Sequence, residues 1–372
     1  MKNRVRFITC TMSVLLLQSL LVTSTPVRAD TFDTTQPVVT QTNQEYEDQE
    51  LSGQVDNLLK QGNFCGTVLI IKDGKPVYTK SIGYADYSKK LMNKDNSSYE
   101  IDSIQKSLTA GLIMKLVQEH KMSLDDKLAK YFPEIPGSHK ITIRQMLDMK
   151  SGLTLSGDGP TVPLPDAQIA NDDAHSLYYS NVMYNKWQYS PINFVLLARI
   201  VEKVSHKNYK QIFTETYIKK LHLKETTFAY GSSNDVNKSQ GYTNNNPLSG
   251  RLTYANPYIT KAYETRDEFG TGQVFMSPGD LYKAERYLVS GDMLTNKSRQ
   301  ELFVPASIST YGGGLYNHTD SRGSNGWGYG YQSVFHISDS GNTAVVVMSN
   351  YQRLANNVKP LANKIFSLAL SE

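Results

Sequence analysis

A serine and a lysine lie three residues apart at the start of a helical run. The stretch EIDSIQKSLTAGLIMKLVQEHKMSLDDKL contains Ser103 and Lys106, and residues at i and i+3 share one face of a helix. Unpaired N–H groups and the helix dipole favour a developing negative charge in the first turn. A serine hydroxyl becomes a nucleophile when a base removes its proton, and a lysine that loses its charge in a dry pocket is such a base. The spacing therefore indicates acyl chemistry, with Ser103 as nucleophile and Lys106 as base.

Two fixed residues are a short pattern, so the surrounding sequence decides what it indicates. A capping serine followed by a solvated lysine would have the same spacing. The longer stretch YEIDSIQKSLTAGLIMKLVQEHKMSLDDKLAKYFPEIPGSHKITIRQMLDMKSGL resembles the nucleophile segment of the serine β-lactamase and penicillin-binding protein superfamily. The branch it resembles holds class C β-lactamases, D-alanyl-D-alanine carboxypeptidases and esterases. The likeness continues through YSPINFVLLARIVEKVS and GTGQVFMSPGDL and covers Leu51 to Ser371. It implies that Ser103 is acylated and that Lys106 is its base.

The second motif of that superfamily is Tyr-x-Asn, whose tyrosine relays protons to and from the leaving group. The bare pattern begins at Tyr179, Tyr242 and Tyr254. The resemblance nevertheless favours Tyr189 over Tyr179, because Tyr189 precedes INFVLLARIVEKV, the amphipathic helix that follows this motif in relatives. Pro191 then replaces the expected asparagine. Proline suits a first helical turn but offers no side-chain hydrogen bond, so the usual contact with a substrate amide is lost.

The third motif, Lys-Thr-Gly or His-x-Gly in relatives, lies on the strand that lines the cleft. Aligning SNGWGYGYQSVFHIS by its glycines places Ser324, Asn325 and Gly326 there. The resemblance implies that Trp327 then supplies a backbone N–H to the oxyanion hole, beside the N–H of Ser103.

Ser324 stands where relatives carry a cation that binds the carboxylate of β-lactams and of D-Ala-D-Ala ends. An uncharged hydroxyl cannot replace that ion pair. Arg322, two residues upstream, is a candidate for the missing cation, since strand alternation is compatible with the same face. The alternative for residues 321–330 is a glycine-rich turn with Trp327 and Tyr329 packed over it.

Strand patterns at both ends of the chain must position these residues. GTVLIIKDGKPVYTKSIGYAD has two strands around an Asp73-Gly74 turn, and YQSVFHISDSGNTAVVVMSN repeats the hairpin pattern near the C-terminus. Helical stretches precede the first pair and follow the second, and helices dominate the chain between the pairs up to about Leu223. Residues 228–271 have no clear period and are predicted to be long surface loops. The sequence predicts an α+β fold, with one antiparallel sheet closed by both chain ends and a largely helical insertion.

The N-terminal segment predicts export. Residues 1–29 combine three early basic residues, an apolar run and Val27-Arg28-Ala29, which is typical of a cleaved signal peptide; an uncleaved anchor is the alternative. Residues 30–50 are polar and read as a flexible linker, and 51–372 as the hydrolase domain. Removing residues 1–29 takes four of the 39 basic residues and none of the 35 acidic ones, so the mature chain is near neutral. Composition therefore gives no reason to expect a nucleic-acid partner.

Other chemistries lack their residues. The seven histidines never fall at metal-ligand spacing, and Cys65 is the single cysteine after residue 29. We expect no metal and no cofactor. The stretch LYYSNVMYNKWQY is unusually aromatic, as expected of core packing or, beside a cleft, of stacking on sugars or polyols.

Together these features predict an exported serine acyl hydrolase that forms a covalent acyl-enzyme with a small-molecule or polymer substrate of the cell envelope. Pro191 and Ser324 both remove groups that would bind a carboxylated, peptide-like ligand. An ester fits better, and a D-alanyl ester of teichoic acid in a Gram-positive envelope is the favoured substrate. The alternatives are a D-alanyl-D-alanine carboxypeptidase, penicillin-binding protein or β-lactamase, and a catalytically silent envelope-binding protein of the same fold.

Overall fold

The computed structural model describes residues 49–155, 162–230, 236–246, 248–306 and 309–371. The predicted signal peptide, residues 1–29, and residues 30–48 of the predicted linker lie outside the described residues. The first helix, α1, begins at Gln49, inside the predicted linker.

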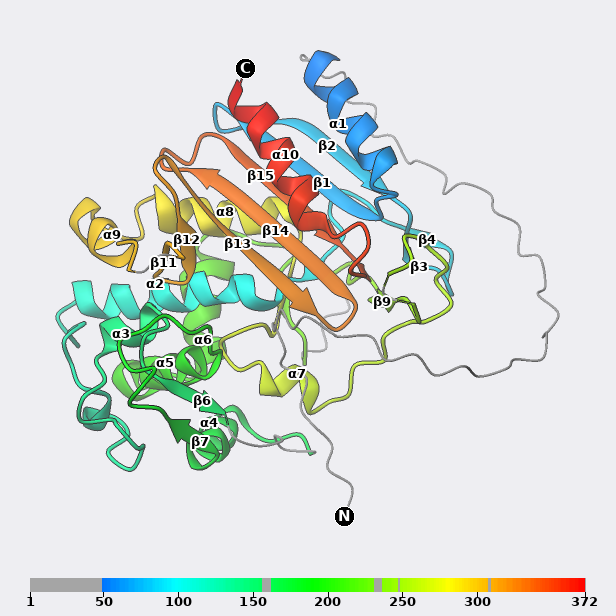
Figure 1. Ribbon diagram of the computed structural model, residues 1–372. Coiled ribbons are helices and arrows are strands. Elements are labelled where there is room, and N and C mark those ends of the chain that lie inside the picture. The colour runs from blue at the N-terminus through cyan, green and yellow to red at the C-terminus, as the bar shows by residue number, and fades with distance from the viewer. Residues whose placement is uncertain (1–48, 156–161, 231–235, 247, 307–308, 372) are drawn as a thin grey trace.

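One antiparallel sheet of seven strands forms the centre of the molecule, in the order β11-β12-β13-β14-β15-β1-β2 (Figure 1). Its strands are β1 (Gly66–Lys72), β2 (Lys75–Ile82), β11 (Tyr311–Gly312), β12 (Leu315–Asn317), β13 (Ser321–Gly328), β14 (Tyr331–Ser338) and β15 (Ala344–Ser349). The two predicted hairpins are present, with Gly74 at φ 73° in the first turn. They join where β1 pairs with β15, with Ile71 opposite Ala344. The predicted α+β fold, with a sheet closed by both ends of the chain, is thus confirmed.

The sheet is covered on both faces because its central strands are apolar on both sides. Val68 and Ile70 of β1 face a small core that the terminal helices α1 (Gln49–Gln61) and α10 (Val358–Ser371) complete. Leu69 and Ile71 alternate to the other face and join the main core. That core includes α2 (Gln105–Gln118) and α8 (Pro278–Val289); in the view of Figure 1, α8 lies behind the sheet and α2 below it.

The helical part follows α2 in the chain. It contains η2 (Leu128–Lys130), α3 (Ile143–Leu147), β6 (Leu153–Leu155), α4 (Asp166–His175), β7 (Leu177–Tyr179), α5 (Ile192–Ser205), α6 (Tyr209–Phe213) and the π-helical turn η3 (Thr214–Lys219). Helix α5 is its centre, because INFVLLARIV is buried at almost every position and packs against α2. Helix α9 (Asn296–Leu302) follows α8 in the chain and precedes the edge strand β11.

The remaining elements are short. They are β3 (Tyr84–Asp86), β4 (Leu91–Met92), β5 (Tyr99–Glu100), β8 (Thr227–Phe228), β9 (Tyr242–Thr243), α7 (Glu264–Asp267), β10 (Val274–Met276) and β16 (Tyr351–Gln352). The described part of 228–271 is mostly irregular, as predicted, but it is not only a surface covering. Tyr242 and Tyr254 pack with Tyr351 around the buried Cys65, and the Tyr254 ring meets the other two edge-to-face. Packed aromatic rings can thus form a core without regular structure.

Candidate active site

Ser103 and Lys106 are in contact, as their spacing predicts. Ser103 lies in a short 3-10 helix, η1 (Asp102–Ile104), which continues directly into α2. The Lys106 Nζ donates a hydrogen bond of 2.8 Å to Ser103 Oγ and one of 3.3 Å to the carbonyl oxygen of Thr271. Lys106 is only 1% exposed, whereas Ser103 remains partly exposed. A buried amine therefore lies against an accessible hydroxyl.

Tyr189 belongs to the same site. It lies just before α5, and its ring centre is 5.5 Å from Lys106 Nζ. The ring packs edge-to-face against Tyr311 of β11, with 6.2 Å between the ring centres. The nucleophile helix, the α5 entrance and the sheet edge therefore meet at this tyrosine.

The competing tyrosine lies elsewhere in the helical part. Tyr179 ends β7, and its ring fills the space above Gly137, where an added Cβ would come within 2.6 Å of it. Its other ring contact is Tyr184, at 6.4 Å. The surrounding aromatic stretch, residues 177–189, packs mostly against the main core, and Tyr178 is its exposed tyrosine. Of the two candidate tyrosines, Tyr189 is the one whose ring lies near Lys106 Nζ.

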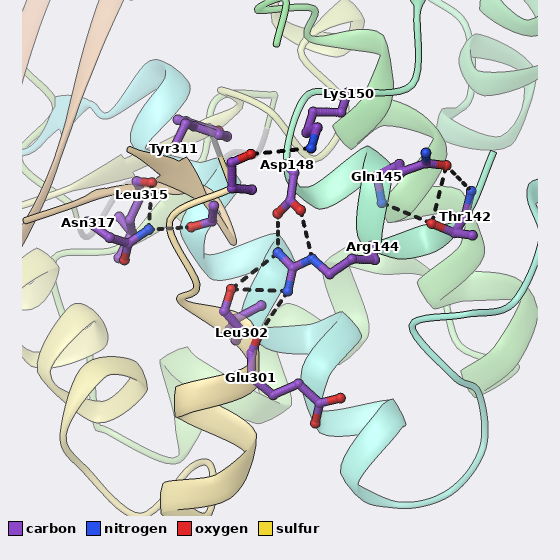
Figure 2. A network of polar contacts seen from close by, with 12 residues as sticks. Thr142, Arg144, Gln145, Asp148, Lys150, Glu301, Leu302, Tyr311, Leu315 and Asn317 are labelled. Carbon is purple, nitrogen blue, oxygen red and sulfur yellow. Dashed lines mark hydrogen bonds and ion pairs between the residues drawn. The ribbon is translucent and has the colours of Figure 1, made fainter. Parts of the chain in front are cut away.

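A polar network connects α3 and the residues that follow it to α9 and to the segment before β11 (Figure 2). Arg144 of α3 is held by Asp148 and donates a 2.8 Å hydrogen bond to the carbonyl oxygen of Glu301 in α9. Burial raises the pKa of Asp148, against the opposing effect of Arg144. Lys150 Nζ donates to the carbonyl oxygen of Ala306, on the segment that leads to β11. Two cations thus connect the helical part to the strand edge that carries Tyr311.

Strand β13 lies directly against the residues before Ser103. A Cβ added to Gly326 would be 2.2 Å from the carbonyl oxygen of Ile101, and one added to Gly328 would be 2.8 Å from Asp102 Oδ1. Only glycine permits this close approach. Trp327 lies between the two glycines, so its backbone is beside η1. The residue is 37% exposed, and its ring faces solvent. The alternative of a simple glycine-rich turn is wrong, since β13 runs from Ser321 to Gly328.

Ser324 is on the same face of β13 as Gly326, by strand alternation, and is buried. Gly323 is on the opposite face, next to His336, which stacks on Phe366 of α10. The face of the sheet that meets η1 is therefore the one away from the terminal helices.

Arg322 also shares the Ser324 face, but its charge is already engaged. Its guanidinium forms an ion pair with Asp339 and lies 4.9 Å from the centre of the Phe303 ring. Asp339 follows β14, at the far end of β13 from Trp327. Any role for Arg322 in binding a substrate carboxylate has to compete with this ion pair.

Two carboxyl groups just before the nucleophile were not predicted from the sequence. Asp102 adopts φ 44°, a left-handed conformation that aspartate tolerates better than most residues. Glu100 and Asp102 are 1% and 4% exposed, and burial raises the pKa of both well above the usual range. The signal was present in YEIDS, where two acidic residues precede the serine within an otherwise apolar stretch.

Sites of other kinds are few in the described part of the chain. No group of three histidine, cysteine, aspartate or glutamate side chains there could hold a metal ion. A hollow of about 480 Å³ lies between α4, α5 and α7, and Asp166, Arg199, Glu202 and Arg266 are among its lining residues. Ser103 is not part of that hollow.

Comparison with known proteins identifies the family. The β-lactamase family model matches residues 51–369. A Bacillus subtilis (strain 168) protein named as penicillin-binding protein PbpX is 30% identical over 321 residues, which cover 86% of this chain and 78% of that protein. The teichoic acid D-alanine hydrolase of Staphylococcus aureus is 25% identical over 325 residues, covering 84% of this chain and 79% of that protein.

Solved structures share the fold. FmtA from Staphylococcus aureus superposes with a TM-score of 0.74 at 22% identity, over 91% of each chain. A D-amino acid amidase from Ochrobactrum anthropi gives a TM-score of 0.70 at 20% identity, over 87% of this chain and 98% of that one. The resemblance recognised around Ser103 is thereby confirmed. The chain belongs to the β-lactamase family, a family of serine hydrolases.

Proposed function

We propose that this protein is a serine acyl hydrolase that acts through a covalent acyl-enzyme on D-alanyl esters of the cell envelope. The observation that carries the proposal is the 2.8 Å contact between buried Lys106 Nζ and the partly exposed Ser103 Oγ. A catalytically silent binding protein would have no need of a buried amine against an accessible hydroxyl.

Acylation begins when Ser103 Oγ attacks the ester carbonyl carbon. The amine form of Lys106 accepts the serine proton, so the 2.8 Å contact then runs from the hydroxyl to the nitrogen lone pair. The carbonyl oxygen becomes an oxyanion, and the backbone N–H groups of Ser103 and Trp327 stabilise it.

The tetrahedral intermediate collapses when the bond to the leaving alcohol breaks. Tyr189, beside Lys106, passes its proton to the departing alkoxide and takes one from the Lys106 ammonium, so both groups return to their starting forms. Water then attacks the acyl-enzyme with the same groups as bases, which releases the carboxylic acid and restores the Ser103 hydroxyl.

An ester substrate accounts for the two departures from the family motifs. Pro191 offers no amide to a peptide-like ligand, and Ser324 offers no charge to a carboxylate. Arg322, the cation nearest to it in sequence, is paired with Asp339. The 25% identical relative named teichoic acid D-alanine hydrolase supports the D-alanyl ester as the acyl donor.

We further propose that the protein works outside the cytoplasmic membrane, after removal of residues 1–29. Residues 30–48 would then precede α1 at the start of the mature chain. In the described part of the chain, no helix combines the length and apolar character needed to cross a bilayer.

Intact-mass spectrometry tests the function. The protein is incubated with p-nitrophenyl acetate, D-alanine esters, D-alanylated teichoic acid, a D-Ala-D-Ala peptide and a penicillin. We expect a Ser103-dependent acyl adduct with the esters, release of D-alanine from teichoic acid, and little labelling by penicillin. Efficient penicillin labelling that is lost in Arg322→Ala would instead support a carboxypeptidase. Absence of any adduct would contradict the hydrolase proposal.

A further inference from the structure

Carboxyl groups gather on one side of the catalytic pair. A Cβ added to Gly272 would be 2.9 Å from Glu268 Oε2 and 3.1 Å from the Cα atom of Asp102. The Glu268 carboxylate therefore lies close to Asp102, the residue that precedes Ser103. Glu100 belongs to the same group. After the larger effect of burial, the Glu268 charge raises the pKa of Glu100, and the charges of Glu100 and then Glu268 raise the pKa of Asp102, against the opposing effects of Lys238 on Glu100 and of Lys106 on Asp102.

Two buried oxygens in this group have no hydrogen-bond donor among the described residues. They are Glu100 Oε1 and Asp102 Oδ2, and their side chains are more than nine-tenths buried. A buried carboxyl oxygen without a donor is unfavourable, so an arrangement that keeps two of them beside a third carboxylate favours a cationic ligand.

Glu268 is the member of the group that a ligand can reach, because it remains partly exposed. Its Oε1 accepts a 3.1 Å hydrogen bond from Tyr329 Oη, and its Oε2 accepts one of 2.8 Å from Thr271 Oγ1. A carboxylate has about four acceptor positions, so acceptor capacity remains. The carbonyl of the same Thr271 accepts from Lys106 Nζ. One residue thus orients Glu268 and contacts the proposed base.

A D-alanyl ester brings a cation to this place by its covalent structure. Its α-ammonium is two bonds from the carbonyl carbon, a separation of about 2.5 Å. When Ser103 attacks that carbon, the ammonium must lie within a few ångströms of η1, where the carboxyl group nearest to solvent is Glu268.

Resting on the proposed D-alanyl esterase function, we propose that the Glu268 carboxylate binds the free α-ammonium of the substrate's acyl group, next to the donor-free oxygens of Asp102 and Glu100. The site would select aminoacyl esters over N-acylated amino acid esters and simple acyl esters. Glu268 is a specificity residue in this account, and Tyr329 and Thr271 position its carboxylate.

The first test compares kcat/KM for D-alanine p-nitrobenzyl ester and its N-acetyl counterpart. We expect the wild type to prefer the free amine by at least about tenfold, because a charge-assisted hydrogen bond is lost on acetylation. Glu268→Gln should reduce that ratio by about ten- to a hundredfold. Glu119→Gln, at an exposed position beyond α2, is the matched control and should keep the ratio.

A binding measurement separates this inference from the proposed function. Isothermal titration calorimetry on Ser103→Ala compares D-alanine amide with N-acetyl-D-alanine amide. We expect the free amine to bind at least about tenfold more tightly, and the difference to shrink to about threefold or less in Ser103→Ala/Glu268→Gln. Selective binding without ester turnover would support the ammonium site and contradict the esterase. Equal binding of both amides, or a preference that survives Glu268→Gln, would overturn the ammonium site even if ester hydrolysis is found.

Discussion

The Lys106 Nζ donates hydrogen bonds to two groups, Ser103 Oγ and the carbonyl oxygen of Thr271. Replacing Ser103 with Ala should abolish turnover of p-nitrophenyl acetate and leave the fold intact, because the change removes one partly exposed oxygen. Lys106→Ala should be nearly as severe, since the serine then lacks its base. Stopped assays and thermal unfolding of both variants check this. Turnover at the wild-type rate by Ser103→Ala would rule out the mechanism.

The choice between two tyrosines is also a question for single residues. Tyr189→Phe removes the hydroxyl of the ring whose centre lies 5.5 Å from Lys106 Nζ, and it should lower kcat/KM by about a hundredfold or more because the proposed proton transfer is lost. Tyr179→Phe, whose ring packs over Gly137, is the matched control and should lower it by less than about threefold. The reverse ranking in steady-state kinetics would mean that the second motif is at Tyr179.

Contacts between elements decide where the catalytic groups lie, and the closest is between β13 and η1. Gly326→Ala would place a Cβ 2.2 Å from the Ile101 carbonyl oxygen, so the strand must move away from Ser103. A shift of about 1 Å in an oxyanion donor can cost about a hundredfold in rate, and we expect a loss of that size in kcat/KM. Gly53→Ala in α1, where a Cβ meets nothing within 4 Å, should keep full activity. A folded Gly326→Ala variant with wild-type kinetics would argue against Trp327 as an oxyanion donor.

The contact between α2 and α8 contains a buried acid that does not take part in the proposed chemistry. Glu285 of α8 accepts a hydrogen bond from Ser107 Oγ, and burial raises the pKa of Glu285 from 4.5 to about 8. Between pH 4.5 and 8 the folded state therefore binds more protons than the unfolded state, so the free energy of unfolding falls as pH rises through this window.

Glu285→Gln removes that titration and keeps the shape of the side chain. We expect the variant to match the wild type below about pH 4.5 and to gain roughly 2–5 kcal/mol in free energy of unfolding by about pH 8 to 9. Urea denaturation at pH 5, 7 and 9 measures this, with exposed Glu301→Gln as the control. A stability difference that stays constant with pH would contradict a raised pKa at Glu285.

Local spacing accounts for what could be predicted from the sequence at these two scales. Ser103 and Lys106 are neighbours on one helical face, so their spacing of three residues was sufficient to predict their contact. The carboxylate of Glu268 could not be predicted, because its approach to Asp102 joins segments more than 160 residues apart. The Arg322 pair with Asp339 joins residues only 17 apart, and it was missed because it depends on the register of β13 and β14.

In the whole molecule, the catalytic groups share one face of the sheet with the main core, and a second, smaller core lies on the opposite face. Hairpin patterns at both chain ends were sufficient to predict that the ends share a sheet, but the exact register between β1 and β15 depends on packing of both cores. Ile365 of α10 is fully buried on the face away from η1. Ile365→Ala should therefore lower the free energy of unfolding by about 2–5 kcal/mol and leave kcat/KM unchanged at temperatures where the variant is folded. Denaturant titration together with ester kinetics checks this, and a matching loss in kcat/KM would show that the two faces are coupled.

The central pairing of β1 with β15 joins two strands that are synthesised at very different times. β1 ends at Lys72 and β15 begins at Ala344, so at about 5–20 residues per second the first strand waits roughly 15–55 s for its neighbour. Throughout that time the nascent chain exposes GTVLIIK, an apolar strand with an unpaired edge. Such an edge can pair with strands of other chains and cause aggregation. Productive folding of this protein therefore depends on keeping that one strand shielded, by a chaperone or by translocation in an unfolded form, until the last hairpin has been made.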